Sequence, residues 1–274
     1  MSKELSFGAL FSKPDVRDYT AATTLSEFPV EFELDMPKVK NQGAVGSCVA
    51  HSLSTVVEYF NQKESGKYTQ MSTGYIYGNR RFSINKGKGM ITRDALHTVS
   101  KYGDVPNKLF NLNVEVPEAI NQFEAQVDGI EAEGYQFKFR EYFKLNNEAA
   151  IKASIMKNGP AVMAMKWFDD IQVVDGVMKT NNVKSVKTSG HCMVIYGWNE
   201  IGWKVRNSWG RNWGDKGNVV IPYNVPLTEV WGVRDAEDDS ELIVKKPFNT
   251  EFGKQLAKFL NAIILFFYNL VHKN

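Results

Sequence analysis

Three short blocks of this sequence carry the side chains of a thiol nucleophile site. Cys48 ends the run NQGAVGSC, His191 follows a Ser-Gly pair, and Asn207 opens the block NSWG. The thiolate is the reactive form of cysteine, so a useful nucleophile needs an imidazole partner, and the imidazole needs a third group that holds its ring and tautomer. Cys48, His191 and Asn207 can fill these roles in that order.

Gln42 adds a fourth group to this chemistry. Its side-chain amide lies shortly before Cys48 and can reach back over the turn toward a negative charge that develops on a carbonyl oxygen. Together with the backbone N–H of Cys48 it would form an oxyanion hole, where the loss of one donor typically costs about 10²- to 10³-fold in turnover.

Each candidate also has a purely structural explanation. Free cysteine is among the most buried residue types, and a single histidine at the start of an apolar strand is more often a hydrogen-bonded core residue than a catalyst. The glycine-rich approach and the upstream glutamine favour a nucleophile at Cys48. The glycine before His191 and the later NSWG block favour a catalytic histidine.

Taken together, the three blocks resemble the papain family of cysteine peptidases. The motifs span Lys40 to Ala50, Ser189 to Gly197 and Asn207 to Gly217 in family order, and the resemblance covers residues 14 to 235. Any one block alone would be weak, whereas three in order are specific. The resemblance implies an endopeptidase that acylates its cysteine and then hydrolyses the thioester. We expect a thiolate–imidazolium ion pair as the resting state.

The resemblance also implies a set of substrate-binding positions. Residues 87–90 look like the glycine-rich strand with which relatives bind the substrate backbone, although a plain loop is the competing interpretation. Met90, Ala164 and Cys192 would line an apolar pocket beside the nucleophile. Trp209 would shield the bond between His191 and Asn207 from water. The full expected set is Gly87, Gly89, Met90, Ala164, Gly190, Cys192 and Trp209.

Two departures from the best-known relatives lie next to the nucleophile. Val49 replaces a tryptophan and His51 replaces an aromatic residue, and neither change removes a catalytic atom. His51 raises the alternative of a zinc site with Cys48, His191 and Cys192. Adjacent strand residues point to opposite faces, so His191 and Cys192 do not suit one ion. We therefore expect no metal and no organic cofactor.

Helices and strands must hold these groups together. Apolar residues recur at helical spacing from Cys48 onward, which predicts a buried helix with the nucleophile at its positive end and Ser47 near its cap. Thr92 is predicted to cap a second helix that ends at Tyr102-Gly103, and Asn147 to cap a third that stops at Gly159-Pro160. Short apolar runs between turns then predict an antiparallel sheet; they are 161–165, 191–196, 203–206 and 218–221.

These elements predict an α+β fold of two lobes with the site in the cleft between them. Residues 1–37 form a short irregular lead-in, too short for the long helical inhibitory proregion of lysosomal relatives. Residues 38–235 form the catalytic domain, with a helical lobe at about 38–130 and a β-rich lobe at about 131–235. Residues 236–274 form an acidic linker and a C-terminal amphipathic helix.

Composition limits the classes of protein that need to be considered. The 274 residues are 43% hydrophobic and 12% aromatic, enough for a well-filled core. Lys and Arg total 33 against 31 Asp and Glu. The net charge of +2 is too small an excess of positive charge to indicate binding to nucleic-acid phosphates. We expect no nucleic-acid partner.

Targeting signals and cysteines favour a cytoplasmic location. The first eight residues show no apolar run behind a basic start, so no signal peptide is predicted. Both cysteines fall inside the catalytic blocks, and Val45 stands where secreted relatives carry a disulfide cysteine. A reducing compartment fits this pattern.

The apolar face predicted for residues 252–271 is too short to span a membrane but suits a docking helix. Three docking sites compete: the enzyme's own surface, a membrane interface or partner, and the active-site cleft. Peripheral membrane association is therefore one expected option.

The expected function is hydrolysis of peptide bonds in a peptide or protein substrate. The same Cys-His-Asn site with an amine acceptor would make a transpeptidase or amide transferase. A third alternative is a catalytically silent homologue that holds peptides in the cleft.

Overall fold

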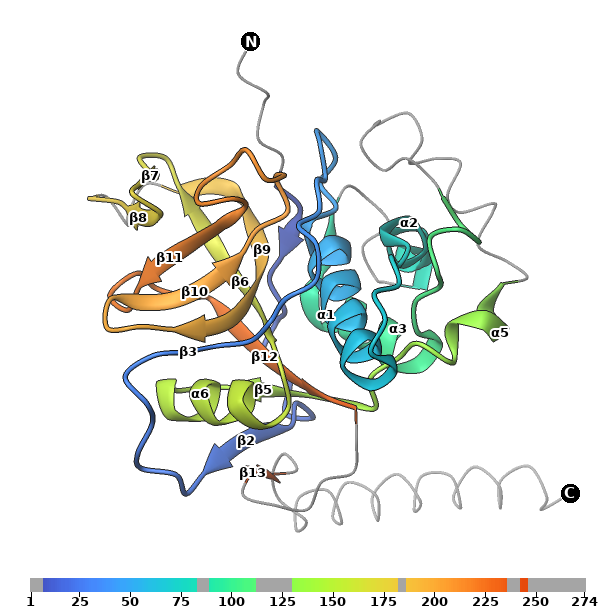
Figure 1. Ribbon diagram of the computed structural model, residues 1–274, viewed down its shortest axis with the longest axis horizontal. Helices are drawn as coiled ribbons and strands as arrows, with labels where there is room; N and C mark the ends of the chain where they lie inside the picture. The colour runs from blue at the N-terminus through green and yellow to red at the C-terminus, as the bar shows by residue number, and fades with distance from the viewer. Residues whose placement is uncertain (1–6, 83–88, 112–129, 182–185, 236–241, 246–274) are drawn as a thin grey trace, which may run out of the picture.

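The computed structural model describes residues 7–82, 89–111, 130–181, 186–235 and 242–245 (Figure 1). The helices are α1 (Cys48–Ser65), α2 (Thr73–Gly78), α3 (Thr92–Tyr102), α5 (Glu131–Gly134) and α6 (Glu148–Lys157), with a 3₁₀ turn η1 at Asn79–Phe82. Figure 1 shows α1, α2 and α3 gathered on one side and most of a long sheet on the other. The fold is α+β, as the sequence predicts.

The described strands form one mixed sheet. They are β1 (Ala9–Leu10), β2 (Thr20–Thr23), β3 (Phe32–Glu33), β4 (Met90–Ile91), β5 (Glu141–Leu145), β6 (Ala161–Phe168), β7 (Gln172–Val174), β8 (Val177–Lys179), β9 (Val186–Trp198), β10 (Gly202–Arg206), β11 (Asn218–Pro222), β12 (Glu229–Arg234) and β13 (Leu242–Lys245). The main order is β13-β2-β5-β12-β6-β9-β10-β11-β8-β7. Most pairs are antiparallel, but β1–β4, β2–β5 and β8–β11 are parallel.

Helix α1 forms as its apolar spacing predicts. Every residue from Cys48 to Phe60 is buried, and the helix ends at Gly66, whose φ of 69° is the left-handed conformation that favours glycine. Ser47 occupies the N-cap position, but its side chain makes no capping hydrogen bond. The sequence therefore locates both the start of the helix and its N-cap residue correctly.

The other two predicted helices also form. Asn147 caps α6, because its side-chain oxygen accepts a hydrogen bond of 2.8 Å from the backbone N–H of Ala150. Helix α3 begins at Thr92 and has Ile91 at its N-cap, one residue earlier than expected. Gly103 follows α3 with a φ of 74°.

The central strands divide two apolar clusters. Along β6, Val162 and Ala164 face α1 whereas Met163 and Met165 face the cluster that α6 covers. This alternation follows from the period of two in a strand. The same alternation in β9 directs Cys192 toward α1 and places His191 on the opposite face.

The lead-in is not irregular, which corrects the sequence prediction. β1, β2 and β3 all lie before residue 38 and join the sheet; Phe32 of β3, for example, pairs with Trp198 of β9. Strands of two to four residues are too short to show alternation, and their pairing partners are distant in the sequence.

A short strand also lies beyond the catalytic blocks, where the sequence predicts linker and helix. β13 pairs antiparallel with β2 at the edge of the sheet. The acidic linker and the predicted helix at 252–271 lie outside the described residues. In the part of the chain that is described, no helix is long and apolar enough to cross a membrane.

Candidate active site

The segment before Cys48 docks on the NSWG block far along the chain. The backbone N–H of Gln42 donates to the carbonyl oxygen of Ser208 over 2.8 Å, and the N–H of Gly210 donates to that of Lys40 over 3.0 Å. The Ser208 hydroxyl donates to the side-chain oxygen of Gln42 over 2.6 Å. Two of the three sequence blocks are therefore joined directly by hydrogen bonds.

A buried ion pair fixes the same segment to α1. Nζ of Lys40 lies 2.6 Å from Oε1 of Glu58, and the Lys40 and Glu58 side chains are 10% and 0% exposed. The same oxygen accepts the backbone N–H of Met71 over 2.8 Å. Burial raises the pKa of Glu58, and the Lys40 ammonium acts against that shift. Sequence reasoning missed this pair, because nothing local marks two residues that meet only after folding.

His191 and Asn207 meet as the sequence predicts. Nε2 of His191 lies 2.7 Å from Oδ1 of Asn207. That oxygen only accepts, so Nε2 carries a proton and Nδ1 is the basic nitrogen of a neutral ring. Asn207 is itself held, because its backbone N–H donates to Gly217 over 3.0 Å and its Oδ1 also accepts from Ser208 N–H over 2.7 Å.

Aromatic rings enclose the imidazole. The Trp209 ring stacks on His191 with centroids 4.2 Å apart and planes at 20°. Trp167 of β6 meets His191 edge-on at 5.3 Å and Trp209 at 4.9 Å. Trp167 carries no motif signal in the sequence, and only folding places it beside the catalytic candidates.

Cys48 opens α1 and is fully buried, as is His191. Burial raises the pKa of the Cys48 thiol to about 11, although the backbone amides of Cys192, Gly8 and Val49 oppose that rise. Burial also lowers the pKa of His191 to about 4, against the bond to Asn207. In this closed arrangement both groups are neutral at pH 7. The expected resting ion pair is therefore wrong for this arrangement, because desolvation disfavours both charges.

The segment that covers the two side chains is the N-terminal residues 7–12. Within it, β1 pairs in parallel with β4 through Ala9 and Met90, and Ala9 also pairs antiparallel with Gly190 of β9. The backbone N–H of Met90 donates to the Gly8 carbonyl oxygen over 2.9 Å. In Figure 1 this dark blue strand lies between α1 and β9.

Glycines make this close approach sterically feasible. A Cβ atom added to Gly8 would collide with the carbonyl oxygen of Gly46, and one added to Gly89 would collide with the carbonyl of Gly8. A Cβ atom on Gly190 would collide with the Phe11 ring. The three backbone segments lie too close together to leave space for a substrate backbone.

The expected substrate-binding residues lie in different surroundings. Met90, Ala164 and Cys192 lie in one buried apolar cluster with Cys48. Gly89 and Gly190 face residues 7–12, as described above, and Trp209 lies on His191. Gly87 lies outside the described residues. Both cysteines are free thiols.

His51 is held within α1. Its Nδ1 lies 2.9 Å from the Ser47 carbonyl oxygen, and burial lowers its pKa to about 4. Among the described residues, no group of three or more His, Cys, Asp or Glu side chains comes together as a metal-binding cluster.

Comparisons with known proteins decide the family. The sequence profile described as "Papain family cysteine protease" matches residues 31–231. The chain belongs to this family. An uncharacterized peptidase C1-like protein of Acanthamoeba polyphaga mimivirus is 25% identical over 274 aligned positions, covering 85% of this chain and 88% of that protein.

Plant and animal relatives match a shorter part of the chain, and a bacterial cysteine protease shares its fold. Vignain of Vigna mungo is 24% identical and cathepsin K of Mus musculus 25% identical; they match 70% and 68% of this chain, which spans 52% and 56% of their own lengths. Xylellain, a cysteine protease from Xylella fastidiosa, shares the fold with a TM-score of 0.75 at 20% identity, covering 85% of this chain and 97% of that one.

Proposed function

We propose that this protein is a cysteine peptidase that hydrolyses peptide bonds through Cys48, His191 and Asn207. The observation that carries the proposal is the 2.7 Å bond between Nε2 of His191 and Oδ1 of Asn207. It fixes the imidazole tautomer that leaves Nδ1 able to take a proton. Cys48, the first residue of α1, would supply the thiol.

The reaction divides into two half-reactions. His191 takes the proton of Cys48, the thiolate attacks the carbonyl carbon of the substrate peptide, and the imidazolium then protonates the departing amine. A thioester on Cys48 remains. Water, deprotonated by His191, attacks that thioester, releases the carboxylic acid product and restores the thiol.

Gln42 and the backbone N–H of Cys48 are proposed to bind the oxyanion. Ser208 holds the side-chain oxygen of Gln42, which orients the amide nitrogen in a defined direction. One N–H of that nitrogen donates to the Val45 carbonyl over 2.9 Å, and the amide carries two such hydrogens. Preorganised donors of this kind stabilise the charge that develops in the transition state.

The proposed substrate is a peptide or protein chain. Its backbone would pair with Gly89 and Gly190, where β1 now lies, and an apolar side chain would enter the cluster of Met90, Ala164 and Cys192. Two free cysteines suit a reducing compartment such as the cytoplasm.

The test uses the full chain with residues 7–12 displaced by Gly8→Ala, because the wild-type site is covered. A peptide library should be cleaved by that variant, and adding Cys48→Ala should abolish cleavage. Asn207→Ala should reduce turnover less, since it orients the base and makes no bond to substrate. A new amide in the presence of added amine would indicate a transferase instead. Cleavage that persists without Cys48 would refute the assignment.

A further inference from the structure

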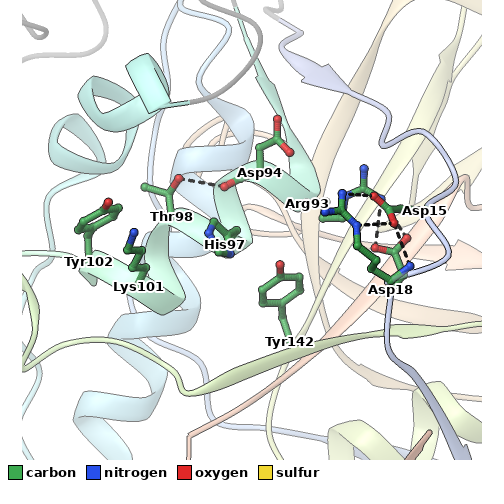
Figure 2. A pocket seen from close by; sticks show the side chains of 10 residues that line it. Asp15, Asp18, Arg93, Asp94, His97, Thr98, Lys101, Tyr102 and Tyr142 are labelled. Atoms are coloured by element: carbon green, nitrogen blue, oxygen red, sulfur yellow. Dashed lines mark hydrogen bonds and ion pairs between the residues drawn. The ribbon is translucent and has the colours of Figure 1, made fainter. Parts of the chain in front are cut away.

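A pocket of about 530 Å³ lies on the face of α3 that carries His97, Lys101 and Tyr102. No residue of the candidate active site lines it. Figure 2 shows the α3 side chains along the pocket, with Tyr142 of β5 beside them and residues 15–18 of the lead-in at one end. The pocket is therefore a separate feature of the surface, formed where α3, β5 and the lead-in meet.

The charged side chains at the lead-in end of this pocket pair with one another. Nη2 of Arg17 lies 2.7 Å from the Asp15 carboxylate. Nη1 of Arg93 lies 3.0 Å from both carboxylate oxygens of Asp18. The whole lining has three acidic and three basic side chains besides His97. A charged ligand would gain little net attraction from such a balanced site.

Aromatic rings provide the uncharged part of the same site. Tyr102 and Tyr142 are half-buried and line the pocket. Val16 and Tyr19, which flank lining residues in the sequence, are 83% and 43% exposed. Aromatic rings in contact stabilise one another beyond the area that they bury. An uncharged aromatic side chain within a partly polar segment is therefore the kind of group that fits this pocket.

The C-terminal end of β13 points toward the pocket. Lys245 pairs with Thr20 of β2, and Thr20 pairs with Lys144 of β5, so these residues form one row across three strands. β13 runs antiparallel to β2, and β2 runs parallel to β5. Two residues beyond the row, in the direction in which β13 runs, lie Asp18 before β2 and Tyr142 in β5. Both of these residues line the pocket.

The chain that follows β13 is long enough to reach this site. Adjacent strands lie about 4.8 Å apart, so β5 lies about 10 Å from β13 across β2. Three extended residues span about 10 Å, which brings Phe248 to that distance from Lys245. Pro247 has no amide N–H with which to continue the pairing to β2, so it favours departure of the chain from the sheet edge.

The segment KPFNTEF at 246–252 lies outside the described residues, and its composition matches the pocket: two phenylalanines stand among polar side chains. We propose that residues 246–252 dock on this face of α3 as a strap, with the Phe248 ring between Tyr102 and Tyr142. The strap connects α3 with the edge of the sheet. It also places the start of the helix predicted at 252–271 beside α3. This proposal does not depend on the proposed function.

The covalent link to β13 favours this occupant over a separate partner. A group tethered by a few residues acts at an effective concentration in the millimolar range, so even a weak contact is populated. A peptide from another molecule would lack that advantage and would compete with the tethered Phe248 ring.

Alkylation of a cysteine placed in the pocket tests the strap. His97 is exposed and lines the pocket, so His97→Cys in the full chain introduces a thiol there and leaves the buried Cys48 and Cys192 unchanged. Labelling by iodoacetamide, followed by mass spectrometry, measures access to position 97. Adding Phe248→Ala, or truncating after Lys245, should raise the labelling rate about tenfold, because a strap docked for about nine-tenths of the time slows access by that factor.

Two controls distinguish docking from a general change in the protein. Phe252→Ala removes the same ring four residues later and should leave labelling at position 97 slow. Met156→Cys, at a position on α6 that is 42% exposed, should label at one rate in every background.

Three results would overturn the proposal. The first is unchanged labelling at position 97 after both Phe248→Ala and the truncation, which keeps β13 paired with β2. The second is an equal effect of Phe252→Ala and Phe248→Ala, because the proposal places only the Phe248 ring in the pocket. The third is protection that fades when the protein is diluted, because it would assign the strap to a second copy of the chain.

Discussion

Ser208 and Gln42 bind each other twice, through the Ser208 hydroxyl and the Gln42 side-chain oxygen at 2.6 Å and through the Gln42 backbone N–H and the Ser208 carbonyl at 2.8 Å. Ser208 is also the neighbour of Asn207, whose oxygen it contacts through its own N–H. The orientation of the proposed oxyanion donor and that of the imidazole therefore depend on one two-residue unit.

Ser208→Ala should lower turnover with little change in KM, because it removes the hydrogen bond to the Gln42 side-chain oxygen, leaves the bond to the Val45 carbonyl, and removes no substrate contact. We expect a loss of about tenfold, less than the 10²- to 10³-fold typical when an oxyanion donor is deleted. Steady-state kinetics in the Gly8→Ala background would measure it. A loss equal to that of Gln42→Ala would mean that the hydroxyl has a direct role.

Lys40→Met should destabilise the fold by about 3 to 5 kcal/mol, because it leaves the buried Glu58 carboxylate without its partner. Adding Glu58→Gln should recover much of that loss. Lys204→Met is the matched control: Lys204 pairs with Glu33 at 2.7 Å, but the Glu33 side chain is 60% exposed, so the cost should be about 0 to 1 kcal/mol. Urea unfolding would measure the free energy of unfolding of the two single variants and of the double variant. Equal destabilisation by Lys40→Met and Lys204→Met would show that burial of the Lys40–Glu58 pair does not matter.

Signals local to the chain predict much of this fold. The spacing of Val49, Leu53 and Val56 predicts α1, and Asn147 predicts the start of α6, because each depends only on neighbours within a few turns. The meeting of His191 and Asn207 is predicted by their motif blocks. Elements and contacts that depend on a local pattern or motif can therefore be predicted from the sequence alone.

The closed state of the site could not be predicted in the same way. β1 has two residues, and its partners Met90 and Gly190 lie far along the chain, so no periodicity or turn signal marks the pairing. The neutral state of Cys48 follows from the burial that this pairing produces. An expectation of an ion pair based on residue types alone omits that desolvation.

The buried histidines should make stability depend on pH. Burial lowers the pKa of both His51 and His191 from 6.5 to about 4, so below pH 6.5 the unfolded chain binds protons that the folded chain excludes. Their contribution to stability is complete above pH 6.5 and falls as pH decreases toward 4, by up to about 1.4 kcal/mol per pH unit for each histidine.

Glu58 and Asp104 act in the opposite direction, because burial raises the pKa of both carboxyl groups. The pH dependence of the unfolding free energy must therefore be compared between variants. Unfolding free energies measured between pH 7 and pH 4.5 should fall less steeply for His51→Gln than for wild type. His97→Gln, which changes an exposed histidine on α3, is the control, and a slope altered equally by both substitutions would refute this account.

Substrates with an apolar residue two positions before the scissile bond should be preferred over those with an acidic or basic residue there. The reason is the uncharged surface of Met90, Ala164 and Cys192 beside Cys48. A charged side chain would lose its hydration there without gaining a partner. Profiling the Gly8→Ala protein with a peptide library would measure the preference, and indifference at that position would exclude the proposed pocket.

The segment from Phe252 to Val271 retains its sequence prediction of a docking amphipathic helix. Docking on the enzyme's own surface is expected first, because residues 7–12 already lie in the cleft and exposed apolar stripes of this size are rare on monomers.

Truncation after Lys245 keeps β13 paired with β2, whereas truncation after Ser240 removes that strand and serves as the comparison. Lower solubility of the Lys245 truncation would support self-docking, loss of binding to phosphatidylserine-containing vesicles would support a membrane surface, and faster Cys48 labelling would support restraint of the site. If the Lys245 truncation matches the full chain in all three measurements, the helix docks in none of these ways.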